Sequence, residues 1–346
     1  MKVGLQLGYW GAQPPTDALE RILEAERLGF DTVFTAEAWG SDAFGPLAWW
    51  GSRTSTIRLG TSIVQLSART PASCAMHALT LDHLSGGRMV LGLGVSGPQV
   101  VEGWYGGPFD KPLARTRAYV DIVRQVLARE APVTSTGPHH SLPYDGPGSL
   151  GLGKPLRSIT HPLRPDLPIW LGAEGPKNVA LTAEIADGWL PIYYAPKVAD
   201  MYRSWLAEGF ARPGARSNPT DFEIAASCSV VVTGDVDAAL DAMRPSLGFY
   251  IGGMGARDMN FHKQVFARMG YEAEAERIQD LFLDGRRDEA IAAVPRSLAA
   301  EISLVGSREK IRDELTTWEE AGVTMLVVGG GSVEQLRRTA EVVLGA

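Results

Sequence analysis

The sequence predicts an α/β fold in which eight parallel strands, alternating with helices, close into a (β/α)8 TIM barrel with insertions. Short apolar runs rich in β-branched residues recur along the chain, and stretches with apolar residues three or four positions apart separate them. This alternation is typical of a parallel sheet covered by helices. Eight such runs can be counted, which favours a closed barrel over an open sheet.

The expected strands are short and apolar, and each lies between helical stretches. They are Val3–Leu7, Thr32–Thr35, Arg58–Val64, Arg88–Val95, Pro168–Gly172, Gly188–Ile192, Phe222–Val232 and Thr324–Val328. Apolar residues at helical spacing predict helices over residues 18–28 and 333–343. Gly29, Gly188 and Gly322 each follow a helical stretch, where a left-handed residue ends the helix. These joints indicate a repeated structural unit.

Two segments do not fit the eight units. Residues 131–167 are rich in proline and glycine, and residues 234–305 have a mostly helical pattern. A bare barrel uses about 250 residues, so a chain of 346 residues has room for both. We expect a single domain over residues 1–346 in which these insertions shape a binding pocket.

Composition and charge exclude several classes of protein. Hydrophobic residues make up 45% and charged residues 21%, as in a folded globular protein. The formal net charge is −7 without a basic block, which argues against a nucleic-acid partner. We find neither a signal-peptide core nor a run of about 18 apolar residues, so we expect no membrane span and a cytoplasmic location. Cys74 and Cys228 fit a reducing compartment and are expected to be packing residues.

Metal chemistry has little support in the sequence. His77 and His83 lie six positions apart, and His139 and His140 are adjacent in a loop-like segment. Neither pair has the ligand spacing of a zinc site. We therefore expect no metal.

The expected strand ends carry aromatic residues and one acidic residue. The active site of a barrel lies where the carboxyl ends of its strands meet. Aromatic residues at those ends could wall a pocket for a large planar ligand, or only pack the barrel rim. They are Tyr9, Trp10, Trp39, Tyr193 and Tyr194. Glu37, after the second strand, is a candidate acid, base or polar anchor, or an ordinary salt-bridged carboxylate.

Glycines gather at three of the strand ends. Gly92, Gly94 and Gly97 match the G-x-G-x-x-G pattern, but Pro98 follows and no helix opens at once, which disfavours a dinucleotide fold. These glycines either thin a strand or admit a ligand close to the backbone. Further glycines, at 329–331, follow the eighth strand.

A Gly-Pro pair opens the helix that follows the fifth strand. Gly175, Pro176, Lys177 and Asn178 could seat a phosphate on the free N–H groups of that helix, with the lysine adding positive charge. The alternative is an ordinary helix start with a solvated lysine.

Several of these segments together resemble the luciferase-like flavin and deazaflavin oxidoreductases, and most closely their branch that uses coenzyme F420. The similar segments are Ala25–Asp31, Leu59–Ile63, Leu81–Arg88, Leu91–Gly106, Leu171–Asn178 and Ala183–Gly188. The similarity runs over most of the chain, from Gly4 to Val328.

The resemblance implies a homodimeric F420-dependent oxidoreductase that transfers a hydride between the deazaflavin and an organic small molecule. It implies a cis peptide bond between Ser62 and Ile63 behind the cofactor ring, and contacts of Glu37 with the cofactor. The further cofactor-binding residues that it implies are Val95, Ser96, Gly97, Gly175, Pro176, Lys177 and Asn178.

Two departures bear on the substrate. The F420-dependent glucose-6-phosphate dehydrogenases resemble this chain, but they carry a catalytic histidine where this chain has Ala38 and a catalytic glutamate where it has Gly97. Oxidation of a sugar phosphate is therefore disfavoured, whereas reduction of a methylene-tetrahydropterin stays open. An FMN-dependent monooxygenase working with a separate reductase and a non-catalytic flavin-binding barrel are the alternatives.

Overall fold

The computed structural model describes residues 1–329 and 331–345, and within them eight parallel strands close a barrel. Gly330, one of the glycines noted after the eighth strand, lies outside the described residues. The barrel strands are β1 (Lys2–Gly8), β2 (Thr32–Thr35), β3 (Arg58–Thr61), β5 (Met89–Gly94), β8 (Ile169–Gly172), β9 (Gly188–Trp189), β10 (Glu223–Ser227) and β13 (Met325–Gly329). Pairing of β3 with β5 completes the closure. Each expected strand overlaps one of these, so the predicted barrel is confirmed.

Two of the expected strands are interrupted. The third gives β3 and, after a break, β4 (Val64–Gln65), which pairs with β5. The seventh divides at Cys228: β10 stays in the barrel, whereas β11 (Ser229–Val232) pairs with β12 (Ser303–Gly306) in a separate parallel sheet. A continuous apolar run cannot reveal this division, because valines and alanines extend through both β10 and β11.

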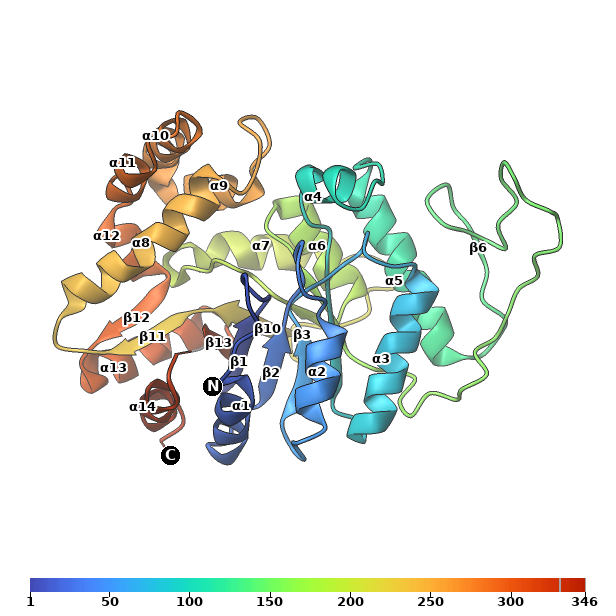
Figure 1. The fold of residues 1–346 in the computed structure, drawn as a ribbon, viewed down its shortest axis with the longest axis horizontal. Helices are drawn as coiled ribbons and strands as arrows, with labels where there is room; N and C mark the ends of the chain where they lie inside the picture. The colour runs from blue at the N-terminus through green and yellow to red at the C-terminus, as the bar shows by residue number, and fades with distance from the viewer. Residues whose placement is uncertain (330, 346) are drawn as a thin grey trace.

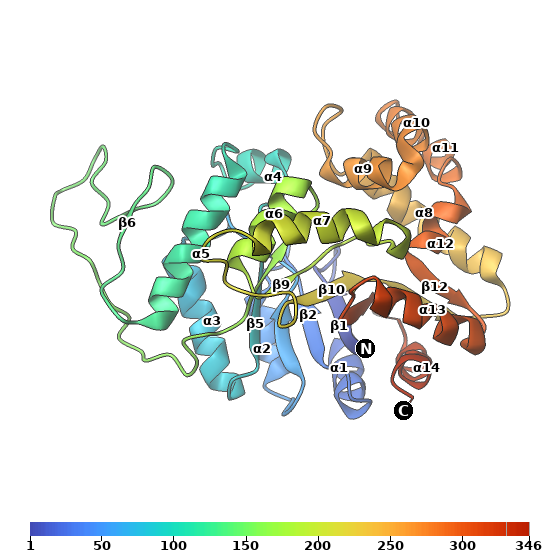
Figure 2. The ribbon, with the colours of Figure 1, turned by 180° about the vertical axis from the view of Figure 1, so that it is seen from behind.

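Helices surround the barrel (Figures 1 and 2). They are α1 (Ala18–Arg27), α2 (Phe44–Gly51), α3 (Pro71–Ser85), α5 (Pro112–Ala128), α6 (Pro176–Ile185), α7 (Ala199–Phe210), α13 (Arg308–Glu320) and α14 (Val333–Val343). Side-chain oxygens of Thr70 and Ser332 accept hydrogen bonds from the first turns of α3 and α14, which satisfies donors left free by the helix. The short helices α4 (Pro98–Gly103) and η1 (Pro196–Val198) lie in loops.

The barrel interior is filled by large side chains opposite glycines. Phe34 is fully buried, and a Cβ placed on Gly60 would lie 2.5 Å from its ring. A Cβ on Gly92 would lie 1.8 Å from the carbonyl oxygen of Thr61. Close approach of neighbouring strands therefore explains Gly92, which is the strand-thinning alternative for this glycine.

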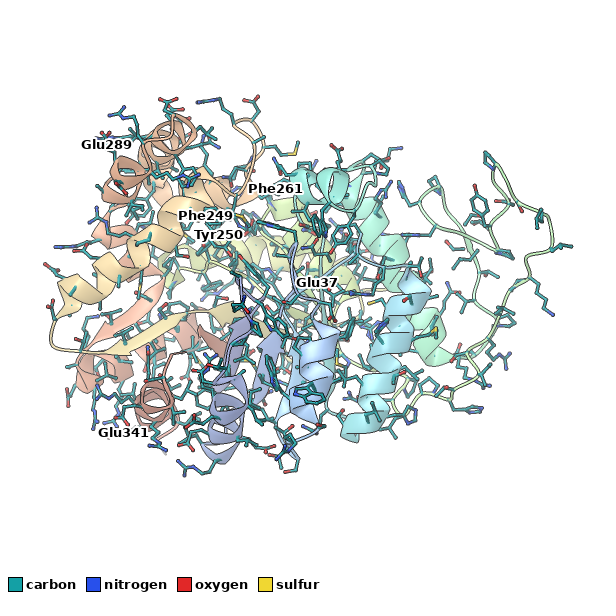
Figure 3. The ribbon with its side chains drawn as sticks, in the orientation of Figure 1. Glu37, Phe249, Tyr250, Phe261, Glu289 and Glu341 are labelled. Carbon is teal, nitrogen blue, oxygen red and sulfur yellow. The ribbon has the colours of Figure 1, made fainter. Side chains whose placement is uncertain are left out.

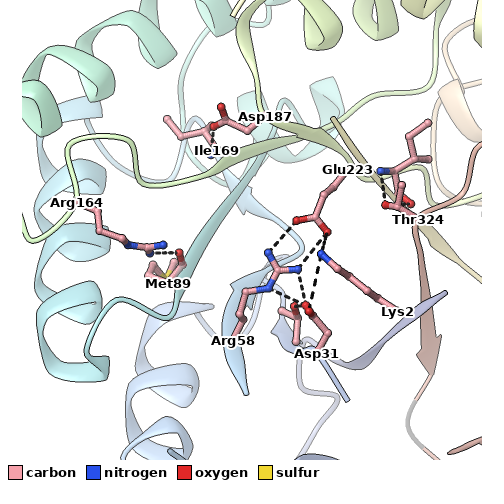
Figure 4. Close-up of polar contacts among 11 residues, drawn as sticks. Lys2, Asp31, Arg58, Met89, Arg164, Ile169, Asp187, Glu223 and Thr324 are labelled. Carbon is pink, nitrogen blue, oxygen red and sulfur yellow. Dashed lines mark hydrogen bonds and ion pairs between the residues drawn. The ribbon is translucent and has the colours of Figure 1, made fainter. Parts of the chain in front are cut away.

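Charged side chains tie together the amino-terminal ends of the strands (Figure 4). Arg58 of β3 donates hydrogen bonds to Asp31, before β2, and to Glu223 of β10, with 3.0 Å between Nη1 and Oε1 of Glu223. Lys2 of β1 reaches Glu223 as well, with 3.0 Å between Nζ and Oε2. Burial opposes the charge of Arg58, but the two carboxylates outweigh it and raise the arginine pKa. This end of the barrel is closed by side chains.

Residues 233–302 form a helical segment over one side of the opposite end of the barrel (Figure 1). Its elements are α8 (Val236–Gly252), α9 (Phe261–Phe266), η2 (Ala267–Tyr271), α10 (Glu272–Leu283), α11 (Arg287–Ala292) and α12 (Arg296–Glu301). These helices bury a hydrophobic cluster of their own around Phe266 and Ile278.

Residues 131–167 form an arm that extends away from the barrel (Figures 1 and 2). The arm holds one short hairpin, β6 (Ser135–Thr136) and β7 (Ser141–Leu142). Arg164 joins its end to the barrel by a hydrogen bond from Nη2 to the carbonyl of Met89, 2.7 Å long. Among the described residues, no helix is both long and apolar enough to cross a membrane.

Candidate functional site

A cavity of about 1100 Å³ opens at the carboxyl ends of the barrel strands. Its walls come from the loops after β1, β2, β5, β8 and β9 and from the helical segment 233–302. Figure 3 labels Glu37 on the barrel side, and Tyr250 and Phe261 on the helical segment. The position is where a barrel carries its active site.

Most of the site residues expected from the sequence line this cavity. They are Tyr9, Glu37, Trp39, Ser62, Ile63, Val95, Ser96, Gly97, Gly175, Pro176, Lys177, Asn178 and Tyr193. Trp10 is not among the lining residues and packs on Trp50, with 6.3 Å between ring centroids. Tyr194 is 1% exposed and donates a hydrogen bond to the carbonyl of Ala321. The structure does not bring these two aromatic side chains to the cavity, because both are used in packing beside it.

Glu37 is held by four hydrogen bonds. Arg69 donates from Nη1 and Nη2 to its two carboxylate oxygens, at 3.0 Å each. The backbone N–H of Gln65 donates to Oε1 at 2.8 Å and that of Ala43 to Oε2 at 3.4 Å. Burial opposes the charge of Arg69, but the bonds with Glu37 outweigh it and raise the pKa of Arg69. Both oxygens of Glu37 are thus engaged within the protein.

The peptide bond between Ser62 and Ile63 is cis, as the resemblance implied. The carbonyl of Ser62 accepts a hydrogen bond from Nε2 of Gln6 at 3.2 Å. The Ile63 side chain covers Gly94, where a Cβ would lie 2.9 Å from it. Ile63 therefore forms an apolar floor at this side of the cavity.

Two buried acceptors beside this floor lack partners. Oε1 of Gln6 and Oε1 of Gln65 make no hydrogen bond within the described part of the chain, and both residues line the cavity. Buried oxygens of this kind normally have a donor. A flat ligand with N–H groups at its edge would supply one, so these two acceptors fit a flavin-like ring.

The start of α6 faces the same cavity. Gly175 is its N-cap, and a Cβ there would meet no atom within 4 Å, so the approach to the first N–H groups is open. Lys177 is exposed beside them. Free N–H groups, the helix dipole and a nearby ammonium group suit a phosphate.

The sequence reasoning missed an acid–histidine pair in the cavity wall. Glu174, two residues after β8, lies 2.6 Å from His262 of α9, measured from Oε1 to Nδ1, and both side chains line the cavity. Glu174 directly precedes Gly175 of the predicted phosphate-binding turn. This position is the feature of the sequence that could have marked it as a site residue. No local pattern joins it to a residue 88 positions away.

Burial disfavours ionisation of three other titratable groups in the cavity wall. Burial raises the pKa of the Tyr193 and Tyr250 phenols and of the Cys228 thiol. Within the described residues, no group of three or more His, Cys, Asp or Glu side chains could hold a metal ion.

Comparison with known proteins places this geometry in a family. The model of the luciferase-like monooxygenase family matches residues 3–325. A protein of Mycobacterium tuberculosis, provisionally named a coenzyme F420-dependent oxidoreductase, is 63% identical over 343 residues, which is 99% of each chain.

Solved structures share the fold at lower identity. A coenzyme F420-dependent tetrahydromethanopterin reductase from Methanopyrus kandleri superposes with a TM-score of 0.79 at 22% identity, over 99% of this chain and 98% of that one. An F420-dependent secondary alcohol dehydrogenase, in complex with an F420–acetone adduct, gives 0.77 at 19% identity over the same shares. These two likenesses support the barrel fold.

Proposed function

The chain belongs to the luciferase-like monooxygenase family, and from this membership we infer that it is a coenzyme F420-dependent oxidoreductase acting on an organic small molecule. The observation that carries the inference is the 63% identity with the Mycobacterium tuberculosis protein over 99% of both chains. When bound, the deazaflavin supplies hydride transfer at the ring carbon that replaces flavin N5. The protein binds and orients the reactants.

We propose that the cofactor ring lies against Ile63, with Ser62, Val95, Ser96 and Gly97 along its border. The unpaired acceptors of Gln6 and Gln65 support this position, because the ring carries N–H groups at its edge. Ser96 has a φ of 61°, which directs the backbone after β5 around the cavity. Excluding water from this floor would protect the hydride transfer.

We propose that Gly175, Pro176, Lys177 and Asn178 bind the cofactor phosphate. The open approach to the first turn of α6 supports this role, as does the exposed Lys177. Glu37 is proposed to anchor the loop beside the cofactor, because Arg69, Gln65 and Ala43 occupy its oxygens.

A direct comparison of cofactors tests the function. Purified protein is titrated with F420 and with FMN, and binding is followed through the fluorescence and visible spectrum of each cofactor. We expect F420 to bind more tightly and its reduced form to react slowly with oxygen. Tighter binding of FMN, with oxygen uptake once FMN is reduced, would instead support a monooxygenase that works with a separate reductase.

We also propose that the chain is one domain whose segments 131–167 and 234–305 are insertions, and that two copies form a homodimer. Trp49 on α2 and Met76 and Leu84 on α3 are 78%, 62% and 77% exposed, and such side chains favour an interface. Light scattering after gel filtration should give the mass of a dimer. The substitution Trp49→Glu should shift that mass toward a monomer.

A further inference from the structure

The Glu174–His262 pair lines the cavity, and the family resemblance assigns it no role. The positions where related glucose-6-phosphate dehydrogenases carry a catalytic histidine and glutamate hold Ala38 and Gly97 here. Glu37, the nearest carboxylate to the first position, has both oxygens engaged. The barrel side of the cavity therefore offers no free acid or base at these positions.

The imidazole of His262 is fixed in one orientation. Its Nδ1 lies 2.6 Å from Oε1 of Glu174. The rings of Tyr250 and Tyr193 stand edge-on to it, at 74° and 88°, with centroids 5.0 Å and 6.2 Å away. The buried Asn260 caps α9 and also donates to the carbonyl of Ile251 at 2.8 Å, which binds the start of α9 to α8. The histidine thus cannot turn away without breaking several contacts.

This orientation leaves one nitrogen for chemistry. A carboxylate beside Nδ1 requires a hydrogen on Nδ1, so Nε2 is the nitrogen that gains or loses a proton. Nε2 of His262 makes no hydrogen bond with any described residue. The side chain is 21% exposed and lines the cavity, so a substrate can reach it.

Several other ionisable groups of the wall are less suited to exchange a proton near neutral pH, among them the buried Cys228 thiol, whose pKa burial raises. Arg268 hydrogen-bonds Gln264, and Lys177 stands at the proposed phosphate site. The phenols of Tyr193 and Tyr250 lie in buried surroundings that favour the neutral form. Histidine is the residue type whose ordinary pKa lies closest to neutrality.

We propose that His262, oriented by Glu174, exchanges the proton that accompanies hydride transfer, and that the substrate is accordingly a ketone or secondary alcohol. This inference rests on the proposed F420-dependent function. Reduction of a carbonyl needs both a hydride at carbon and a proton at oxygen, so a single proton-exchanging group at the cavity wall fits this substrate class. His262 is the catalytic residue and Glu174 the positioning residue.

The reaction balances in both directions. In reduction, a bound deazaflavin in its reduced form would supply the hydride for the new C–H bond. As the C=O π electrons move to oxygen, that oxygen takes a proton from Nε2 of His262. The substrate gains two electrons and becomes an alcohol, and the cofactor loses them. His262 regains its proton from solvent, and oxidation of the cofactor would return one proton to solvent, so the protons balance. In oxidation, Nε2 accepts the hydroxyl proton as the hydride leaves.

The wall beyond the pair indicates what the substrate carries. Ser246, Gln264 and Arg268 line part of it, but most of its larger side chains are apolar and come from the helical segment and from its junction with β12. They are Met243, Leu247, Met254, Phe261 and Ile302. Methionine side chains adapt to irregular apolar shapes. We therefore expect ketones and alcohols with bulky apolar substituents to react faster than charged or sugar-like ones.

The substitution His262→Ala tests the catalytic role. We expect kcat with an apolar ketone or secondary alcohol to fall about 100-fold or more, in the range that general acid–base groups contribute. Added imidazole should restore part of the rate, whereas F420 affinity, measured by fluorescence, should stay within about twofold of wild type. The matched control is His161→Ala, an exposed histidine on the arm, which should behave as wild type.

The positioning role of Glu174 has a readout that needs no cofactor. In cofactor-free protein, the ¹⁵N shifts of the imidazole should show the hydrogen on Nδ1 in wild type, and Glu174→Ala should move the population toward Nε2–H. The same variant should lower kcat with little change in KM. An unchanged tautomer would overturn the role of Glu174.

Failure of this inference is separable from failure of the proposed function. If wild-type protein does not bind F420, the function itself is wrong. If wild-type protein binds F420 but turns over no ketone or alcohol in a panel of apolar and polar compounds, the substrate class is overturned. If His262→Ala matches the wild-type rate, the catalytic role is overturned while the function stands.

Discussion

Two glutamates that each follow a barrel strand have opposite surroundings. Glu37, after β2, has a side chain that is 2% exposed and accepts four hydrogen bonds, two of them from Arg69. Glu174, after β8, is 15% exposed and contacts a single histidine across the cavity wall. The same residue type at equivalent points of the repeat thus forms a closed pair in one case and an open pair in the other.

The difference shows how a barrel separates structural from chemical use of a carboxylate. A carboxylate whose oxygens accept hydrogen bonds from several fixed donors is held in place and has no lone pair left for a ligand or a proton. A carboxylate with a single partner fixes the orientation of that partner, and the other atoms of the partner stay free to react. Counting the donors around each carboxylate is therefore more informative than its position on the strand.

The largest expected effect is a difference in protein stability between variants of the two pairs. Glu37→Gln leaves the partly buried Arg69 without its counter-charge, so we expect the free energy of unfolding to fall by about 3 kcal/mol. Glu174→Gln removes one charge from a partly exposed pair and should cost about 1 kcal/mol or less. Urea unfolding followed by circular dichroism measures both. Equal losses for the two variants would contradict the distinction.

A double variant sharpens this result. Replacing Glu37 by Gln and Arg69 by Met together removes the uncompensated charge, so part of the stability should return. Equal stability of the double variant and Glu37→Gln alone would mean that the loss arises from Glu37 contacts other than Arg69.

A smaller effect is expected at the phosphate site beside the open pair. Lys177→Glu places negative charge next to the proposed phosphate, so F420 binding should weaken about tenfold, equivalent to about 1.4 kcal/mol. The weakening should diminish as salt is added, because Lys177 is exposed. Lys154→Glu, a matched change on the arm, should leave affinity unaltered. Unchanged affinity of Lys177→Glu at low salt would count against this phosphate site.

The smallest effect concerns two thiols, Cys74 beside Arg69 and Cys228 in the cavity wall. Burial raises the pKa of Cys74, close to Arg69, to about 11, and it raises the pKa of Cys228 in the cavity wall. A raised pKa means that thiolate forms only as the pH approaches that value, so at pH 8 roughly one Cys74 thiol in a thousand is ionised. Iodoacetamide at pH 8 should label both cysteines slowly in native protein and rapidly in urea. Fast native labelling of Cys228 would reveal a second reactive group in the cavity.

The strands of the barrel were predictable because most of their residues are buried on both faces, which leaves short runs rich in apolar residues. The residues at their carboxyl ends followed from this, since parallel strands end at one face. The division of the apolar run 222–232 at Cys228 was not predictable, because β10 and β11 are both apolar and differ only in the strands they pair with.

Side-chain direction and distant pairing limited the prediction of the site. Tyr193 and Tyr194 are adjacent, yet one lines the cavity and the other packs beside α7. Sequence alone could not separate them, because both are aromatic residues near a strand end. His262 lies in a segment expected to shape the pocket, but its contact with Glu174 depends on how α9 folds over the barrel. Such a contact is tertiary and has no local signature.

The parallel pairing of β11 with β12 has a consequence for how this protein can change over evolution. The chain leaves the barrel along β11 and returns along β12, and the rungs of their ladder run from Ser229 with Ser303 to Val232 with Gly306. Everything between, including His262 and most of the apolar wall, is thus a cassette mounted on two neighbouring strands. Exchanging that cassette between relatives would alter which molecules are accepted, while the floor at Ile63 and the turn at Gly175 stay as they are.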